Sequence, residues 1–159
     1  MKTVSKNIII RNSPEKVFSY MDNLGNTGMH MMQSSSMMMG SKLKLELLSE
    51  NATGLNAKFR WYGNMMGIKM DFTVDVTKWI KDKEKVWETV GDAKMIILGW
   101  YQMRLQLTPI TEGTKAELSI AYTYPKKILG KILTFFLAQW YANWCLKSML
   151  SNSKQSLET

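Results

Sequence analysis

The second quarter of the chain alternates between apolar and polar residues. From Lys42 to Leu47, leucines alternate with lysine and glutamate, and the same period of two recurs over 55–62 and 68–77. Successive side chains of a β-strand point to opposite faces, so this pattern predicts antiparallel strands with one apolar and one polar face. Less regular apolar runs predict further strands. Together, the predicted strands span residues 3–11, 42–47, 55–62, 68–77, 85–90, 94–108 and 114–124.

The second and third alternating strands are expected to form a hairpin. Placing Trp61 opposite Met70 sets Arg60 opposite Asp71, whereas a register shifted by two residues sets this arginine opposite a lysine. Like charges directly opposed across two strands destabilise a sheet. The first register is therefore predicted.

The long strand expected over 94–108 is apolar on both faces around Gly99. A glycine inside a strand often marks a bulge. Without a bulge, Ile96, Leu98 and Trp100 would form an outward apolar patch, suited to a homodimer contact or to another protein partner.

Helical signals begin directly after the first strand. Ser13 is a good N-cap and Pro14 suits the first helical position, so a short helix is predicted over 14–22. Two glycines loosen the segment that follows. Residues 23–41 are therefore expected to form a broken helix or a loop.

A long helix is predicted over residues 126–153, after Pro125. Its apolar arc is wider than an ordinary surface helix needs. The run without a charged residue covers only 132–146, which is shorter than the roughly 20 apolar residues of a membrane span. The helix is therefore not expected to span a membrane, and a face around Phe135 remains open to contact with a membrane surface.

Three stretches have a familiar form: IIIRNSPEKVF from Ile8 to Phe18, TPITEGT from Thr108 to Thr114, and the entry into the last helix through Pro125. With the order of the elements, they resemble the START-like, or SRPBCC, superfamily, which includes polyketide cyclase/dehydrase-like and coenzyme Q-binding proteins. The resemblance covers almost the whole chain and implies a single α+β domain over 1–159 with a helix-grip fold. In that fold, a curved antiparallel sheet of about seven strands wraps around a long C-terminal helix. One or two short helices follow the first strand, and a cavity lies between the sheet and the long helix.

Members of this superfamily commonly bind lipids, sterols, polyketides or other apolar molecules, and some are enzymes. The superfamily has no universal catalytic motif, so the resemblance assigns no catalytic residue. The leading hypothesis is a carrier or sensor of a hydrophobic or amphipathic small molecule, such as a lipid, a polyketide or a quinone-like compound. One alternative is a cyclase or dehydratase in which a tyrosine or Arg104 polarises a carbonyl group. Another is a protein-interaction module.

The candidate ligand-binding residues are large apolar side chains on the predicted strands, the long helix and a methionine-rich stretch. They are Met29, Met32, Phe59, Trp61, Met70, Phe72, Tyr101, Met103, Tyr122, Phe136, Trp140 and Trp144. An ordinary aromatic core would use the same residues, so the pattern leaves a filled core and a pocket equally open.

The stretch MHMMQSSSMMMG, from Met29 to Gly40, contains the only histidine and six of the fourteen methionines. Methionine is flexible and polarizable, which suits an adaptable lid or pocket wall. Plain packing or a loop without function is a second interpretation. A third is a soft-metal site, because thioethers and a histidine can bind Cu(I).

The net charge of +8, from 21 basic and 13 acidic residues, favours anionic partners such as an acidic membrane surface. The lysines are scattered without a nucleic-acid-binding motif, so a nucleic-acid partner is not expected. The tightest group, KDKEK over 81–85, is interrupted by acids and is typical of a solvated turn.

The remaining residues point to no cofactor and no catalytic site. A single cysteine, Cys145, excludes an internal disulfide, and one histidine with one cysteine does not make a zinc site. The first 15 residues contain only three consecutive apolar residues, which is too short for the apolar region of a signal peptide. A cytoplasmic protein is expected, with peripheral membrane contact as an open possibility.

Overall fold

The computed structural model describes residues 1–32, 42–65, 67–126 and 131–159. Its helices and strands follow the predicted order closely. They are β1 (Lys2–Ile10), α1 (Pro14–Asp22), α2 (Leu24–Thr27), α3 (Met29–Met32), β2 (Lys42–Leu47), β3 (Lys58–Met65), β4 (Ile68–Ile80), β5 (Glu84–Lys94), β6 (Tyr101–Ile110), β7 (Gly113–Tyr122) and α4 (Lys131–Leu157).

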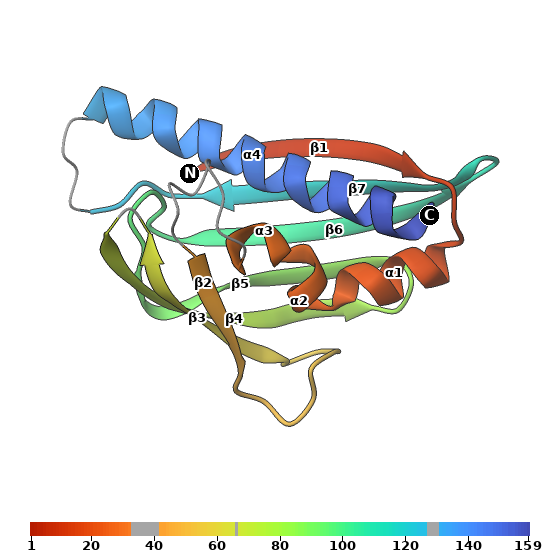
Figure 1. The fold of residues 1–159 in the computed structure, drawn as a ribbon, viewed down its shortest axis with the longest axis horizontal. Helices are drawn as coiled ribbons and strands as arrows, with labels where there is room; N and C mark the ends of the chain where they lie inside the picture. The colour runs from red at the N-terminus through yellow and green to blue at the C-terminus, as the bar shows by residue number, and fades with distance from the viewer. Residues whose placement is uncertain (33–41, 66, 127–130) are drawn as a thin grey trace.

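The strands form one antiparallel sheet in the order β1-β7-β6-β5-β4-β3-β2. In Figure 1, α4 runs in front of this sheet along β1 and β7, and the short helices α1 to α3 lie beside α4 on the same side. Buried and less buried residues alternate along β7 and through most of β6 and β4, so one face of the sheet is covered by the helices. This is the predicted helix-grip architecture, with a seven-stranded sheet around a long C-terminal helix.

The helix after β1 begins as its sequence predicts. The Ser13 side chain accepts a hydrogen bond from the backbone N–H of Lys16 at 3.4 Å, and Pro14 is the first helical residue. The next cap is Asn23, whose side chain accepts a hydrogen bond from the N–H of Gly25 at 2.8 Å and starts α2. A capped turn satisfies backbone donors that a helix end otherwise leaves free. The segment from residue 23 is thus a broken helix as far as Met32, and residues 33–41 of the predicted segment lie outside the described residues.

The register predicted for the hairpin of β3 and β4 is wrong by two residues. Trp61 lies opposite Phe72, not Met70, because the strands stay paired up to the Met65–Ile68 pair at the turn. The expected ion pair nevertheless forms diagonally, with Arg60 Nη2 2.7 Å from Asp71 Oδ2. Long side chains reach diagonal neighbours across a strand pair, so charge pairing alone did not determine the register.

The single strand predicted over 94–108 is wrong as well. β5 continues to Lys94, residues 95–100 are irregular, and β6 begins at Tyr101. The expected outward patch is also absent: Leu98 is buried, and Ile96 and Trp100 are half-buried. Leu98 belongs to the core and Ile96 packs against it, so this segment does not supply the exposed contact that the interaction-module hypothesis required.

The solvated turn predicted over 81–85 is correct only in part. Asp82 has a positive φ of 62° in the turn, but Glu84 and Lys85 already belong to β5. The Lys85 side chain is fully buried and forms an ion pair with Asp22 at the end of α1. This contact connects the short helices to the sheet.

The C-terminal half of α4 is fixed to the first connection of the chain. The Asn12 side chain donates to the backbone oxygen of Leu157 at 3.0 Å, and the Arg11 N–H donates to the Glu158 carboxylate at 2.7 Å. Leu146, Met149 and Leu150 of this half are buried in the core. Among the described residues, no helix is long and apolar enough to cross a bilayer.

Candidate functional site

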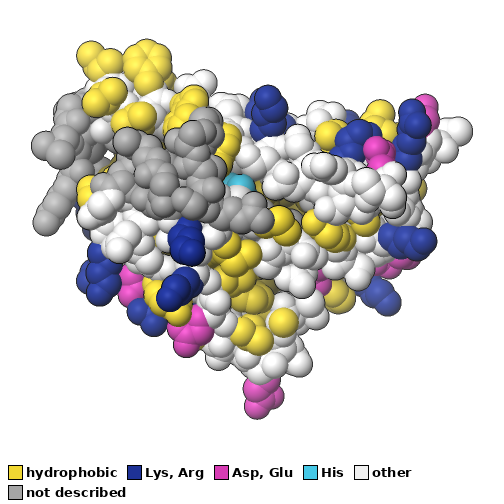
Figure 2. Space-filling view, viewed as in Figure 1, with side chains coloured by type: hydrophobic (Ala, Val, Ile, Leu, Met, Phe, Trp, Pro, Cys, Tyr) yellow, Lys and Arg dark blue, Asp and Glu magenta, His cyan; other side chains and the backbone are white. Residues whose placement is uncertain are grey.

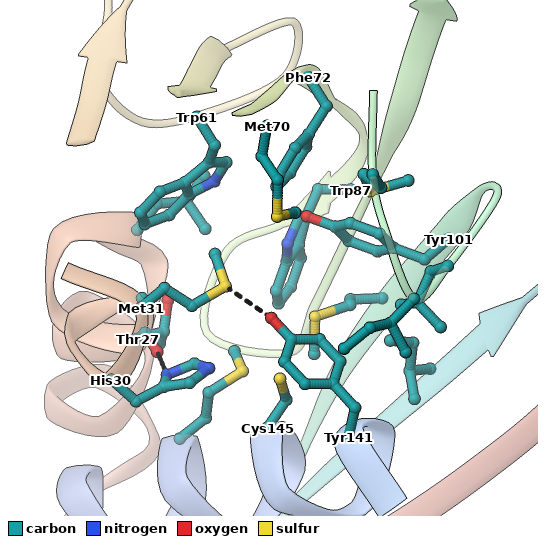
Figure 3. A pocket seen from close by; sticks show the side chains of 18 of the residues that line it. Thr27, His30, Met31, Trp61, Met70, Phe72, Trp87, Tyr101, Tyr141 and Cys145 are labelled. Carbon is teal, nitrogen blue, oxygen red and sulfur yellow. Dashed lines mark hydrogen bonds between the residues drawn. The ribbon is translucent and has the colours of Figure 1, made fainter. Parts of the chain in front are cut away.

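A cavity of about 60 Å³ lies between the sheet, the short helices and the middle of α4. The sheet contributes its covered face, three residues of α4 close the cavity across from the sheet, and α2 and α3 form the side between them (Figure 3). Its nineteen lining residues are Leu24, Thr27, Gly28, His30, Met31, Trp61, Met65, Met70, Phe72, Trp87, Met95, Ile97, Leu98, Tyr101, Met103, Ile120, Tyr141, Cys145 and Met149.

Methionine is the commonest residue in this lining, with six of the nineteen positions. They come from α3, β3, β4, β6, α4 and the segment between β5 and β6. An unbranched thioether changes shape by rotating about three bonds, so methionine walls adapt to contents of different form. The cavity is far smaller than the roughly 300–1,000 Å³ of common ligand pockets. A larger molecule enters only when these side chains move.

Five of the twelve predicted site residues line the cavity: Trp61, Met70, Phe72, Tyr101 and Met103. The other seven lie outside the lining. Of these, Phe59 and Tyr122 are buried in the core, Phe136 and Trp140 are exposed on α4, and Met29, Met32 and Trp144 are half-buried.

The alternative of a cyclase using Arg104 finds no support in the position of that residue. Arg104 is exposed on β6 and donates to the carboxylate of Glu84 on β5. Because it alternates with the buried Met103 and Leu105, its side chain is on the face of the sheet opposite the cavity.

His30 was not among the predicted ligand-binding residues, yet it lines the cavity. The His30 Nδ1 lies 3.1 Å from the backbone oxygen of Thr27, and the ring packs edge-on against Trp144 with a centroid distance of 5.1 Å. Burial lowers the pKa of His30 from 6.5 to about 4, although the contact with the Thr27 oxygen opposes this shift. The imidazole is therefore neutral near pH 7. The only signal for it in the sequence was its position in a run of methionines, of which Met31 and Met32 pack against the core.

Two further polar groups meet in the cavity. The Tyr141 hydroxyl donates to Met31 Sδ across 3.6 Å and so joins α4 to α3 (Figure 3). Burial raises the pKa of the Cys145 thiol to about 12. The thiolate, which is the nucleophilic form of cysteine, is therefore scarce at neutral pH. Cys145 acts here as a small apolar residue of the cavity wall.

The lowered pKa of the half-buried His30 predicts a pH-dependent stability. Between about pH 6.5 and pH 4 the unfolded chain binds a proton that the folded chain does not, so stability is complete above this range and falls as the pH decreases. We expect urea unfolding to show a loss of about 2 kcal/mol from about pH 7 to about pH 5. His30 is the only histidine, so the variant His30→Gln should show a nearly flat profile over this range. The same slope in both proteins would contradict the assignment.

Solved structures of similar fold cover nearly the whole chain. TTHA0849 from Thermus thermophilus matches with a TM-score of 0.73 and 17% identity, over 99% of this chain and 97% of that one. Ara h 8.0201 matches with a TM-score of 0.68 and 10% identity, over 99% and 97% of the two chains. The major latex-like protein 151 of Panax ginseng matches with a TM-score of 0.64 and 8% identity, over 98% and 97%.

No protein-family model matches the sequence, and no curated protein matches it. The likeness is therefore one of structure, and it extends from the first strand to the last helix. At these identities it concerns the fold alone, which is a helix-grip fold.

Proposed function

We propose that the chain binds a small apolar or amphipathic molecule in the cavity between the sheet and α4, as a carrier or sensor. The observation that supports this best is the lining itself, in which aromatic, aliphatic and methionine side chains surround a few polar atoms. Burial of apolar ligand surface would supply most of the affinity, at roughly 25 cal/mol per Å² before ordering costs. A lipid, a polyketide or a quinone-like compound has the required chemistry.

Entry of such a ligand requires the cavity to open on the side of α3. Met31 lies on this short helix, and its side chain accepts a weak hydrogen bond from the Tyr141 hydroxyl across the cavity. Sulfur is a weak acceptor. Rotation of the Met31 side chain would therefore enlarge the cavity at low cost. The methionine-rich stretch thus contributes to an adaptable wall through its described part, and its residues 33–40 lie outside the described residues.

Filling the cavity from α4 should reduce ligand binding. Cys145→Met adds apolar volume at a buried wall position, and we expect the affinity for the fluorescent probe anilinonaphthalene sulfonate to fall by at least about tenfold. Titration of the probe measures the effect. Ser148→Met, a half-buried position of the same helix outside the lining, is the matched control and should bind like the original protein. Equal binding by the original protein and Cys145→Met would place the probe elsewhere and contradict the proposal.

A second candidate function is reversible contact with an anionic membrane surface, favoured by an exposed apolar face on the first turns of α4. We define this α4 face by Ile132, Leu133, Phe136 and Trp140, whose exposed fractions are 76%, 62%, 63% and 45%. Hydrophobic side chains gather at the upper left of Figure 2, where these turns lie in Figure 1. The net charge of +8 would add attraction to acidic lipids.

The membrane candidate predicts binding to vesicles that contain phosphatidylserine. We expect Leu133→Gln combined with Phe136→Gln to weaken binding by at least about tenfold in a sedimentation assay, because each inserted side chain contributes apolar burial. Leu55→Gln, at a 57% exposed leucine far along the chain from α4, is the control. Added salt should weaken the electrostatic part of the binding. No sedimentation with vesicles at any salt concentration would exclude this candidate.

A further inference from the structure

Two buried polar atoms of the cavity lining have no hydrogen-bond partner in the part of the chain that the structure describes. They are Thr27 Oγ1 and His30 Nε2. Thr27 is only 2% exposed, at the end of α2, and His30 follows three residues later on α3. Folded proteins pair nearly all buried polar atoms, so two unpaired atoms in one apolar cavity call for a partner outside the described part of the chain.

The contacts of the imidazole determine which role Nε2 can play. The hydrogen-bond partner of Nδ1 is the backbone oxygen of Thr27, at 3.1 Å, and a carbonyl oxygen can only accept a hydrogen bond. Nδ1 therefore carries the proton and donates, and in the neutral ring Nε2 is left with a free lone pair. Figure 3 shows the ring with one nitrogen at Thr27 and the other directed into the cavity. Nε2 thus can only accept a hydrogen bond, and no described residue donates one to it.

Thr27 supplies the complementary group. Its hydroxyl can donate one hydrogen bond and accept others. The Tyr141 hydroxyl already donates a hydrogen bond to Met31 Sδ, so the unpaired groups of the lining are the Thr27 hydroxyl and His30 Nε2. A ligand group that both donates and accepts would satisfy Nε2 and Oγ1 together.

We propose that the ligand carries a hydroxyl group, which donates to His30 Nε2 and accepts from Thr27 Oγ1 while its apolar part fills the methionine-lined cavity. This inference rests on the proposed function. The ligand class is an apolar alcohol or phenol. A carboxylate does not fit this position, because it has no proton to donate to Nε2.

Two isomeric probes isolate the donated hydrogen bond. Decanol and nonyl methyl ether contain the same atoms, but only decanol can donate a hydrogen bond. Displacement of bound anilinonaphthalene sulfonate measures the affinity for each. We expect decanol to bind about tenfold more tightly than the ether, because the ether leaves Nε2 without a donor.

The outcomes separate this inference from the proposed function. Binding of both probes with equal affinity would overturn the hydroxyl assignment while leaving the apolar cavity as a binding site. Failure of both probes to displace anilinonaphthalene sulfonate would count against the proposed function itself.

Variants and a spectroscopic signal test the two residues directly. His30→Phe should bind both probes equally, Thr27→Val should bind decanol more weakly than the original protein, and Thr27→Ser should restore the original affinity. Because the chain has one histidine, its ¹⁵N spectrum contains a single imidazole, and decanol should shift the Nε2 resonance whereas the ether should not. This readout uses the unchanged protein, so it remains decisive if a variant does not fold. An identical Nε2 shift with both probes would overturn the proposal.

Discussion

Replacing Lys85 by methionine is expected to reduce the free energy of unfolding by about 3–5 kcal/mol. The Lys85 side chain is fully buried on β5, where Nζ lies 2.8 Å from Asp22 Oδ1 and donates to the Asp22 backbone oxygen at 2.6 Å. Burial lowers the pKa of this lysine, and the nearby Asp22 opposes the shift. Removing the ammonium group would leave the carboxylate of Asp22 buried, with the Trp79 ring N–H as its remaining side-chain donor at 3.1 Å among the described residues.

A double-mutant cycle tests this pair by urea unfolding. Asp22→Asn alone should also be strongly destabilising, whereas the double variant should lose much less than the sum of the two single losses, because neither charge is then left alone. Lys78→Met is the control, since the Lys78 side chain is 49% exposed and its partner Glu84 keeps a second cation, Arg104, when Lys78 is replaced. It should cost less than about 1 kcal/mol. Equal losses for Lys85→Met and Lys78→Met would contradict the structural role of the buried pair.

Gly99→Ala is expected to destabilise the fold by about 2–4 kcal/mol. A Cβ atom at this position would lie 2.5 Å from the backbone oxygen of Tyr124 and 2.9 Å from the Thr123 hydroxyl. Backbone hydrogen bonds hold the two segments together here, from the Gly99 N–H to the Thr123 oxygen and from the Thr123 N–H to the Trp100 oxygen, each at 2.9 Å. The segment can make room only by breaking these bonds.

Gly99→Ala should also alter the shape of the cavity, because Ile97 and Leu98 of this segment line it. We expect weaker binding of anilinonaphthalene sulfonate together with a lower melting temperature. Gly91→Asn provides the control: Gly91 has a φ of 68°, which asparagine tolerates, and a Cβ atom added there would meet no other atom within 4 Å among the described residues. If Gly99→Ala were as stable as Gly91→Asn, the close approach to Tyr124 would not be a constraint.

The sequence predicted the strands and helices well where local signals were strong. Alternation over 42–47 and 68–77 identified two strands, the second with one buried face, and Ser13 with Pro14 located the start of α1. These signals are local, since side-chain direction in a strand and the free donors of a helix end depend on neighbouring residues alone. The prediction of one strand over 94–108 was wrong because a continuous apolar run shows no alternation between the two faces. The break at 95–100 follows from packing against the end of β7.

The candidate site was predicted only in part for the same reason. Trp61, Met70 and Phe72 were found because alternation assigns a residue to the covered face of a strand. Alternation does not tell where along that face the helices leave a cavity, so Phe59 was included although it lies outside the lining. Over 132–146 nearly every residue of α4 is apolar, and the helical period therefore did not distinguish the exposed Trp140 from the lining residue Tyr141.

The sequence by itself determined the order of the elements, the covered face of most strands and the bias toward methionine. Only the tertiary structure decided that Lys85 is buried against Asp22, that His30 faces the cavity, and that methionines from six separate segments form one wall. The first group depends on spacing between neighbours in the chain. The second depends on contacts between residues far apart in sequence, such as the 63 positions that separate Asp22 from Lys85, and a linear pattern contains no information on which distant residues meet.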